Sequence, residues 1–152
     1  FEATIKLPAI YPYAQKAGEV IADMLGQAGI KLKIEIVEWA FWLDRIFKQK
    51  DFELSMIGHA EAWDIGIYAN PNYYFQYDSA EFRTAYDNAL KATTEADQAK
   101  WFARCQEIIA EDAVNGYLMV LPSLSAMKAE VMNWWTNYPT IALDCTEVWW
   151  SR

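Results

Sequence analysis

An alternation of strand-like and helix-like patterns over residues 1–58 limits what this chain can fold into more than any other feature. Apolar residues occupy every second position over residues 1–7 and again over residues 30–38, which is the period of a strand. Between these segments, residues 12–28 place apolar side chains at the i, i+3, i+4 and i+7 spacing of an amphipathic helix. A second helix is predicted over residues 39–48, and a third strand over residues 52–58. This order with short links predicts an α/β fold, an open and mostly parallel sheet flanked by helices, with right-handed crossovers.

The second half of the chain has a different character. Residues 58–78 follow no regular pattern, and a loop of about 20 residues in a compact domain is usually functional. Two helices are predicted next, over residues 79–92 and 95–113. The continuous apolar run Tyr117–Leu121 is typical of a buried strand, and the sequence predicts short strands near its end, over residues 130–135 and 143–150. We find no repeat and no low-complexity linker, which favours one domain over residues 1–152.

Two local signals mark helix ends. Gly29 follows the first predicted helix, at the position where a glycine commonly ends a helix in a left-handed conformation. Thr94 and Asp97 have the spacing of a capping box at the start of the last helix.

Charge and composition exclude several classes of protein. The chain has 152 residues and a net charge of −8, which argues against a nucleic-acid or anionic-membrane partner. Apolar residues make up 54%, so the chain is not disordered, and no apolar run is long enough to cross a membrane. With only His59, Cys105 and Cys145, sites that need several histidines or four cysteines are excluded, and no metal or cofactor is predicted. Both cysteines are expected to be buried apolar side chains, with a bridge between them left open.

Aromatic residues are unusually frequent, with 8 Trp, 9 Tyr and 7 Phe. So many large rings cannot all be central in a domain of this length. Trp and Tyr suit ligand clefts and interfaces because each combines apolar area with a polar group. We therefore expect several of them to line a cleft, or to cover a surface that more protein normally buries.

The predicted sheet edge collects the candidate binding residues. In open parallel sheets, ligands bind beyond the carboxyl ends of the strands. The segments that leave these ends are Pro8–Tyr13, Glu38–Trp39 and residues 58–64, with Pro122 as a further candidate. They are acidic and aromatic, which suits a cationic or amphipathic ligand. The ligand-binding residues predicted on this basis are Glu38, Trp39, His59, Glu61, Trp63, Asp64 and Tyr73.

Each of these residues also has a plainer interpretation. His59 is more often a hydrogen-bonded structural residue than a general base or metal ligand. Glu61 and Asp64 are candidates for holding a cationic group, but loop acids are more often solvated or capping. Tyr73 and Tyr74 either line a cleft or pack against a helix. The chain has no nucleophile elbow, phosphate-binding glycine loop or zinc-protease motif, which favours a binding module over an enzyme.

Several segments, in order, resemble one protein family. AGEVIADMLGQAGIKLKIEIVE (17–38), DFELSMIG (51–58) and ANPNYYFQY (69–77) are similar to the carboxyl-terminal lobe of the peptide/nickel-type (family 5) solute-binding proteins of bacterial ABC importers. Residues 79–112, ending in QEIIAED, resemble the late helices of that lobe, and Tyr117–Pro122 its buried strand. The likeness covers about 130 residues and lies in the order of the segments rather than in one motif.

The resemblance implies a lobe of the type II periplasmic-binding-protein fold and a non-catalytic receptor. It implies a fragment of a two-lobed protein near its carboxyl terminus, in the periplasm, that binds a peptide-like solute and delivers it to a membrane permease. Peptide-binding members often carry a Gly-Trp pair and an acid four residues before the proline. In this chain His59, rather than a tryptophan, follows Gly58, and Ile67, rather than an acid, stands four residues before Pro71. The solute class therefore stays open. Trp63 and Asp64 would then take the place of the family's tryptophan and acid, at positions shifted along the sequence.

Two other functions remain alternatives at this point. The first is a hydrolase that uses Glu61, Asp64 and His59, which lie within six residues of each other. The second is an aromatic-rich interaction domain that binds a partner chain through Trp149 and Trp150. The absence of a signal-peptide pattern after Phe1 indicates a processed chain or part of a longer one.

Overall fold

The computed structural model describes residues 1–60, 64–122, 124–136 and 144–151. The chain divides into two compact units. The first comprises Phe1–His59 with Asn72–Gln76, and the second comprises Ala60–Pro71 with Tyr77–Arg152. The prediction that residues 1–152 form a single lobe stays a prediction.

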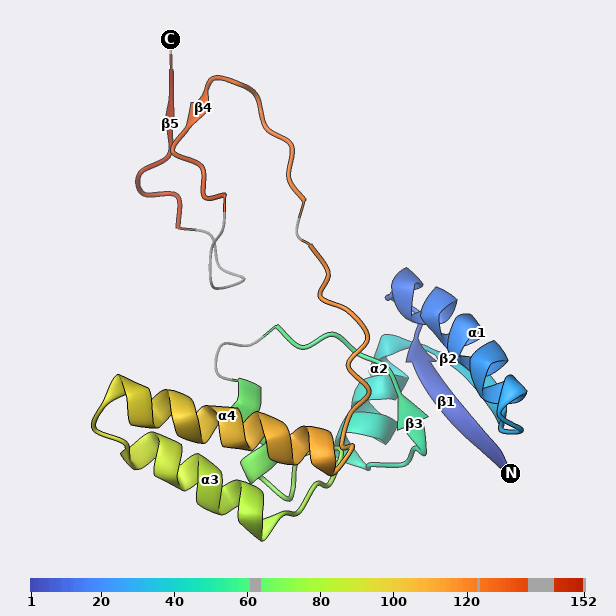
Figure 1. The fold of residues 1–152 in the computed structure, drawn as a ribbon. Helices are drawn as coiled ribbons and strands as arrows, with labels where there is room; N and C mark the ends of the chain where they lie inside the picture. The colour runs from blue at the N-terminus through green and yellow to red at the C-terminus, as the bar shows by residue number, and fades with distance from the viewer. Residues whose placement is uncertain (61–63, 123, 137–143, 152) are drawn as a thin grey trace. The chain divides into compact units, whose positions relative to one another are not determined.

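The first unit is a three-stranded parallel sheet with helical segments between its strands (Figure 1). The strand order is β2-β1-β3, so the first strand lies in the centre. The elements are β1 (Glu2–Pro8), α1 (Pro12–Gln27), β2 (Lys31–Val37), α2 (Trp39–Phe41), the π-helical η1 (Trp42–Lys48) and β3 (Leu54–Ser55). The predicted parallel pairing is thereby confirmed, with Ile5 opposite Ile34 on one side and Leu54 on the other.

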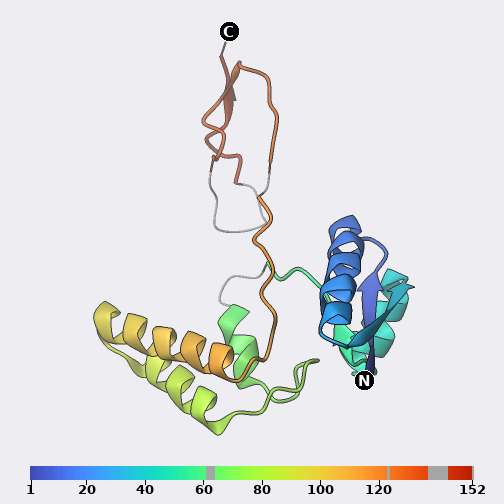
Figure 2. The same ribbon diagram turned by 45° about the vertical axis from the view of Figure 1, so that its right-hand side comes forward.

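One face of the sheet packs against α1. Ile5 and Leu7 are buried on this face, because alternate residues of a strand point to the same side. They form a core with Ala14 of α1, and Ile34 of β2 packs against it. Gly18 fits against Leu7, since a Cβ atom there would lie 2.5 Å from a methyl group of that side chain. Figure 2 shows α1 in front of the sheet in this unit.

A second cluster forms around η1. Trp42 and Ile46 are buried in it together with Tyr74. The indole Nε1–H of Trp42 donates to Ser55 Oγ at 2.9 Å, and that hydroxyl donates to the Lys6 carbonyl oxygen at 2.8 Å. These bonds attach η1 to the side chain of Ser55 in β3 and, through it, to the backbone of β1.

Two antiparallel helices dominate the second unit. Its elements are the 3₁₀ helix η2 (Asp64–Ala69), α3 (Ala80–Lys91), α4 (Glu95–Glu111), β4 (Val131–Met132) and β5 (Trp149–Trp150). Phe82 of α3 and Cys105 of α4 are fully buried. Ser79 and Thr94 cap the two helices, each side-chain oxygen accepting from a backbone N–H three residues on, which confirms the predicted cap at Thr94.

The predicted buried strand Tyr117–Leu121 is wrong. These residues have no regular secondary structure, and Val120 is 95% exposed. The hydroxyl of Tyr117 lies 2.8 Å from that of Tyr68, so the start of the segment is attached to η2. A strand needs a neighbouring backbone, and no strand of the described residues pairs with this segment.

Smaller corrections concern the ends of elements and one cysteine. The third strand is Leu54–Ser55 rather than residues 52–58, and the loop that follows contains η2. Cys105 is buried as predicted, whereas Cys145 is exposed, and both are free thiols. The two short strands predicted near the end are present as β4 and β5, paired antiparallel. No helix of the described residues is long and apolar enough to cross a membrane.

Candidate functional site

The strand order of the first unit points to one edge of the sheet as the candidate ligand site. From β1 the chain crosses to β2 on one side, then returns past β1 to β3 on the other. Right-handed crossovers place the two connecting helices on opposite faces, so the chain switches direction at β1. In such sheets, ligands bind at the carboxyl ends of the strands beside the switch point. Here that point lies at the carboxyl ends of β1 and β3.

Aromatic side chains occupy this edge. Tyr11 and Tyr13 follow β1, with ring centroids 5.4 Å apart. Trp39, at the start of α2 after β2, meets Tyr11 edge-on at 6.0 Å. The Trp39 ring also stacks on the Trp42 ring, with centroids 5.1 Å apart and an interplanar angle of 5°. The segments after two neighbouring strands are therefore joined by ring contacts.

The ring contacts continue to the segment after β3. Tyr74 meets Trp42 edge-on at 5.6 Å. The imidazole of His59 stacks on Tyr74 at 6.2 Å, with Nε2 3.4 Å from the tyrosine hydroxyl oxygen. Tyr73 lies 5.1 Å from Tyr74 and 6.3 Å from His59. We call the seven residues in this series the aromatic edge: Tyr11, Tyr13, Trp39, Trp42, His59, Tyr73 and Tyr74.

The members of the aromatic edge differ in exposure. Trp42 and Tyr74 are buried and form its base, whereas Trp39 and Tyr73 are half-buried and His59 is exposed. The two tyrosines therefore differ: Tyr74 packs in the core, whereas Tyr73 retains accessible surface that a ligand could contact. Exposed ring faces suit apolar, aromatic and cationic groups of a ligand.

Glu38 and Tyr13 set the electrostatics of this edge. Glu38 precedes α2, its side chain makes no capping bond to that helix, and it is exposed. The carboxylate is therefore accessible to a cationic group. Burial and the neighbouring Tyr11 raise the pKa of the Tyr13 hydroxyl, against a smaller effect of the Gly58 backbone amide. Tyr13 therefore stays neutral at physiological pH.

The structure brings four of the seven predicted binding residues into one unit: Glu38, Trp39, His59 and Tyr73. Asp64 opens η2 and belongs to the other unit. Glu61 and Trp63 lie outside the described residues. Sequence reasoning missed Trp42, whose ring lies between those of Trp39 and Tyr74. Its position three residues after Trp39, on the same side of a helix, was the available signal.

The part of the chain that the structure describes shows no candidate metal site. This part contains no group of three or more His, Cys, Asp or Glu side chains able to hold an ion. The one histidine is in ring contact with two tyrosines. The edge offers aromatic surface and a carboxylate, which is the composition of a binding surface.

Comparison with solved structures identifies the fold. The chain is similar to the oligopeptide-binding protein AppA from Bacillus subtilis in complex with a nonapeptide, with a TM-score of 0.68 and 21% identity. It is also similar to the ABC transporter-associated periplasmic binding protein DppA from Helicobacter pylori in complex with the peptide STSA, with a TM-score of 0.63 and 23% identity. Each likeness covers 75% of this chain and 24% of the other, so the chain spans about a quarter of the length of these structures.

The likeness and the parallel sheet flanked by helices confirm the predicted fold class. They also confirm the resemblance to peptide-binding proteins at the level of the fold. No family model and no curated protein sequence matches the chain. The two structures named above are of proteins described as binding proteins.

Proposed function

We propose that this chain is part of the ligand-binding lobe of an extracytoplasmic receptor that binds a peptide-like solute for an ABC importer, without catalysis. The observation that carries the proposal is the aromatic edge at the switch point of a sheet whose fold is similar to that of two peptide-binding proteins. The proposed partners are the remaining lobe of the receptor and a membrane permease. The proposed location is the periplasm.

The edge suggests how a peptide would be held. The exposed faces of Trp39 and Tyr73 provide apolar walls, and the hydroxyl of Tyr73 provides a hydrogen-bonding group. Glu38 would pair with an amine or a basic side chain, as a charge-assisted bond. Glu61, Trp63 and Asp64 stay predicted contacts from the loop that follows. Closure of a second lobe over the ligand, a hinge motion, would complete the cleft.

Native mass spectrometry of the natural receptor, purified from its own host, tests the solute class. We expect a peptide that co-purifies with the receptor and is released on denaturation. A bound solute of another class would contradict the peptide assignment but keep the receptor function. Turnover of added peptides by the purified receptor would contradict a non-catalytic role.

Variants of the same receptor test the site. Trp39→Ala is expected to weaken binding of the identified solute at least ten-fold, because a stacking wall is lost. Glu38→Gln removes only a charge from an exposed side chain, so it tests the electrostatic contact without disturbing the fold. Trp149→Ala is the matched control, since Trp149 lies exposed in β5 of the other unit. Unchanged affinity in both edge variants would show that the ligand binds elsewhere.

One observation favours the alternative interaction domain. Trp149 and Trp150 are 52% and 55% exposed, although Trp is among the residues most often found at protein interfaces. Such a domain is expected to associate with a partner chain through these rings. Sedimentation of the receptor and pull-down of partner chains, each with and without Trp149→Ala and Trp150→Ala, test it. A monomer that captures no partner chain would contradict this alternative.

A further inference from the structure

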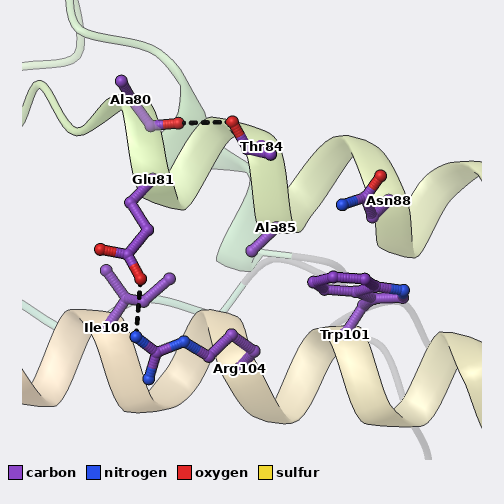
Figure 3. A pocket seen from close by; sticks show the side chains of 8 residues that line it. All are labelled: Ala80, Glu81, Thr84, Ala85, Asn88, Trp101, Arg104 and Ile108. Atoms are coloured by element: carbon purple, nitrogen blue, oxygen red, sulfur yellow. Dashed lines mark hydrogen bonds and ion pairs between the residues drawn. The ribbon is translucent and has the colours of Figure 1, made fainter.

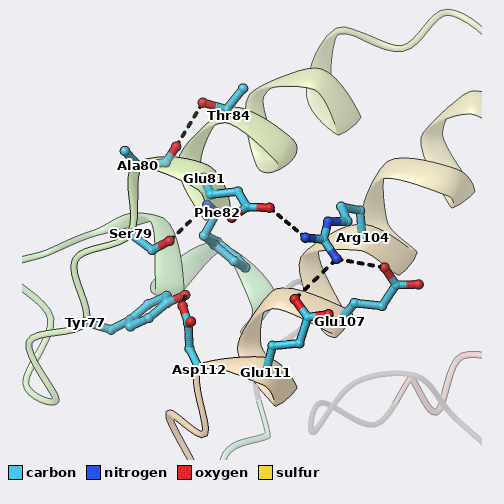
Figure 4. A network of polar contacts seen from close by, with 10 residues as sticks. All are labelled: Tyr77, Ser79, Ala80, Glu81, Phe82, Thr84, Arg104, Glu107, Glu111 and Asp112. Carbon is cyan, nitrogen blue, oxygen red and sulfur yellow. Dashed lines mark hydrogen bonds and ion pairs between the residues drawn. The ribbon is translucent and has the colours of Figure 1, made fainter.

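The charged groups between α3 and α4 are paired within the second unit. Figure 3 shows a groove of about 330 Å³ between these helices, with Trp101 across one end. The only charged side chains that line it, Glu81 and Arg104, form an ion pair with each other. Glu107 and Glu111 also pair with Arg104, as Figure 4 shows. The Glu81–Arg104 pair therefore joins α3 to α4, and these charged groups are satisfied without a ligand.

The π-helical segment η1 gives the first unit a rare helix geometry beside the aromatic edge. Hydrogen bonds of a π-helix join residues five apart, and the Gln49 N–H donates in this way to the Asp44 carbonyl oxygen at 3.1 Å. In an α-helix, residues five apart point about 140° away from each other. In the wider π turn they come onto the same side of the helix. Such turns occur frequently at functional sites.

Trp42 and Phe47 are five residues apart in η1, and their rings meet. The ring centroids are 6.0 Å apart. Both rings also contact the buried ring of Tyr74, which lies 5.6 Å from that of Trp42 and 5.5 Å from that of Phe47. The same two side chains on an α-helix would point apart. The π turn therefore brings Phe47 to the aromatic edge.

Phe47 also meets Tyr73, the half-buried ring that is proposed to contact the peptide. The two centroids are 5.8 Å apart with an interplanar angle of 89°, which is an edge-to-face contact. This arrangement is one of those that pairs of aromatic rings prefer. Phe47 thus contacts both the buried base of the aromatic edge, at Trp42 and Tyr74, and the accessible ring of Tyr73. Its ring limits the orientations open to Tyr73.

We propose that Phe47 is a positioning residue of the peptide site, which holds the rings of Tyr73 and Trp42 in the orientation that binding needs. Phe47 acts through Tyr73, whose hydroxyl and ring face are proposed peptide contacts. It also acts through Trp42, on which the ring of Trp39 stacks. This inference deepens the proposed function and rests on it.

Crystal structures of ligand-free variants of the natural receptor test the positioning. Phe47→Ala removes a side chain that is 39% exposed, so the receptor is expected to fold. We expect the Tyr73 ring of this variant to leave its original orientation or to adopt two. Phe47→Tyr keeps an aromatic ring and is expected to restore the orientation. Phe41→Ala is the matched control, because Phe41 is 43% exposed and belongs to none of the ring contacts described above.

A tetrapeptide library measures the effect on binding. The receptor, stripped of bound solute, is incubated with the library, and the peptide that it retains most strongly is titrated into each variant by calorimetry. Phe47→Ala is expected to bind this peptide about two- to ten-fold more weakly, the effect of losing one aromatic pair. Phe47→Tyr and Phe41→Ala are expected to bind it as the unaltered receptor does.

Two results would overturn the role of Phe47 alone. A Tyr73 ring that keeps its orientation in Phe47→Ala would show that Phe47 does not position it. Equal affinity of Phe47→Ala and Phe41→Ala for the retained peptide would show that binding does not depend on Phe47. A receptor that retains no peptide from the library would instead contradict the proposed peptide binding and the role of Phe47 together.

Discussion

The central strand β1 and the segment Tyr117–Leu121 have similar apolar character but opposite structures. Ile5 and Leu7 of β1 are 5% and 0% exposed, whereas every residue of the segment 117–121 is exposed. β1 has a neighbouring strand on each side and α1 across one face. No strand of the described residues pairs with the later segment. Apolar residues favour burial, but a strand forms only where another backbone satisfies its hydrogen bonds.

The same substitution in the two regions gives the largest expected effect. Leu7→Ala removes a fully buried side chain and is expected to lower the free energy of unfolding by about 2–5 kcal/mol. Leu118→Ala changes a half-exposed side chain and is expected to cost no more than about 0.5 kcal/mol. Denaturant unfolding of both variants measures the difference. Similar losses would mean that residues 117–121 are buried after all.

A glycine pair tests how far local backbone geometry stabilises the first unit. Gly29 ends α1 at a φ of 81°, and a Cβ there would meet no atom within 4 Å. Gly29→Ala is therefore expected to cost roughly 1–2 kcal/mol from the backbone alone. Gly26 has similar free space inside α1, and Gly26→Ala is expected to stabilise the chain by about 0.5–1 kcal/mol. Thermal unfolding measures both variants. A lower midpoint temperature for Gly29→Ala and a higher one for Gly26→Ala would support the role of the positive φ at Gly29.

The matching test in the second unit concerns a helix start. Thr94 Oγ accepts the Asp97 N–H at 3.1 Å, and its hydroxyl donates to the Asp97 carboxylate at 2.8 Å. Thr94→Ala is expected to cost about 1 kcal/mol of stability. Thr93→Ala removes the same atoms one residue earlier and is expected to be neutral. Equal losses, measured by denaturant unfolding, would contradict the capping role.

The smallest expected effect is a pH dependence that both units share. Burial raises the pKa of Tyr13 in the first unit, and burial followed by its hydrogen bond to Asp112 raises that of Tyr77 in the second. Their neutral forms stabilise the folded state. This contribution is full below the unfolded pKa of about 10 and is lost as the pH rises through the higher folded values.

Phenylalanine variants check this dependence. Tyr13→Phe and Tyr77→Phe are each expected to reduce the decline of stability above pH 10, measured by urea unfolding across that range. Tyr117→Phe serves as the comparison, because Tyr117 is 70% exposed. An unchanged decline in both test variants would assign the alkaline loss of stability to other groups.

Much of the fold was predictable because its signals are local. The strand and helix periods over residues 1–48, the glycine end at Gly29 and the cap at Thr94 all appear in the structure close to their predicted positions. Three predicted site residues, Glu38, Trp39 and His59, follow strands β2 and β3 for the same reason, since parallel strands place their carboxyl ends together. Tyr73 belongs to the same unit through the segment Asn72–Gln76, which returns to it from η2. The spacing of Trp39 and Trp42 indicated that these two rings share one side of a helix. The contact of Trp42 with Tyr74 was not predictable, because it depends on which rings meet across separate segments.

The period and direction of the first βα units, the end of α1 at Gly29 and the start of α4 at Thr94 follow from the amino-acid sequence alone, because they arise from spacing between neighbouring residues and from backbone preferences. Only the tertiary structure decided that residues 117–121 stay unpaired, that Cys145 is exposed and that Tyr74 rather than Tyr73 is buried. It also decided that α3 and α4 leave a groove beside Trp101. These outcomes depend on contacts between residues distant in the chain, and the same apolar or aromatic residue is buried or exposed according to what packs against it.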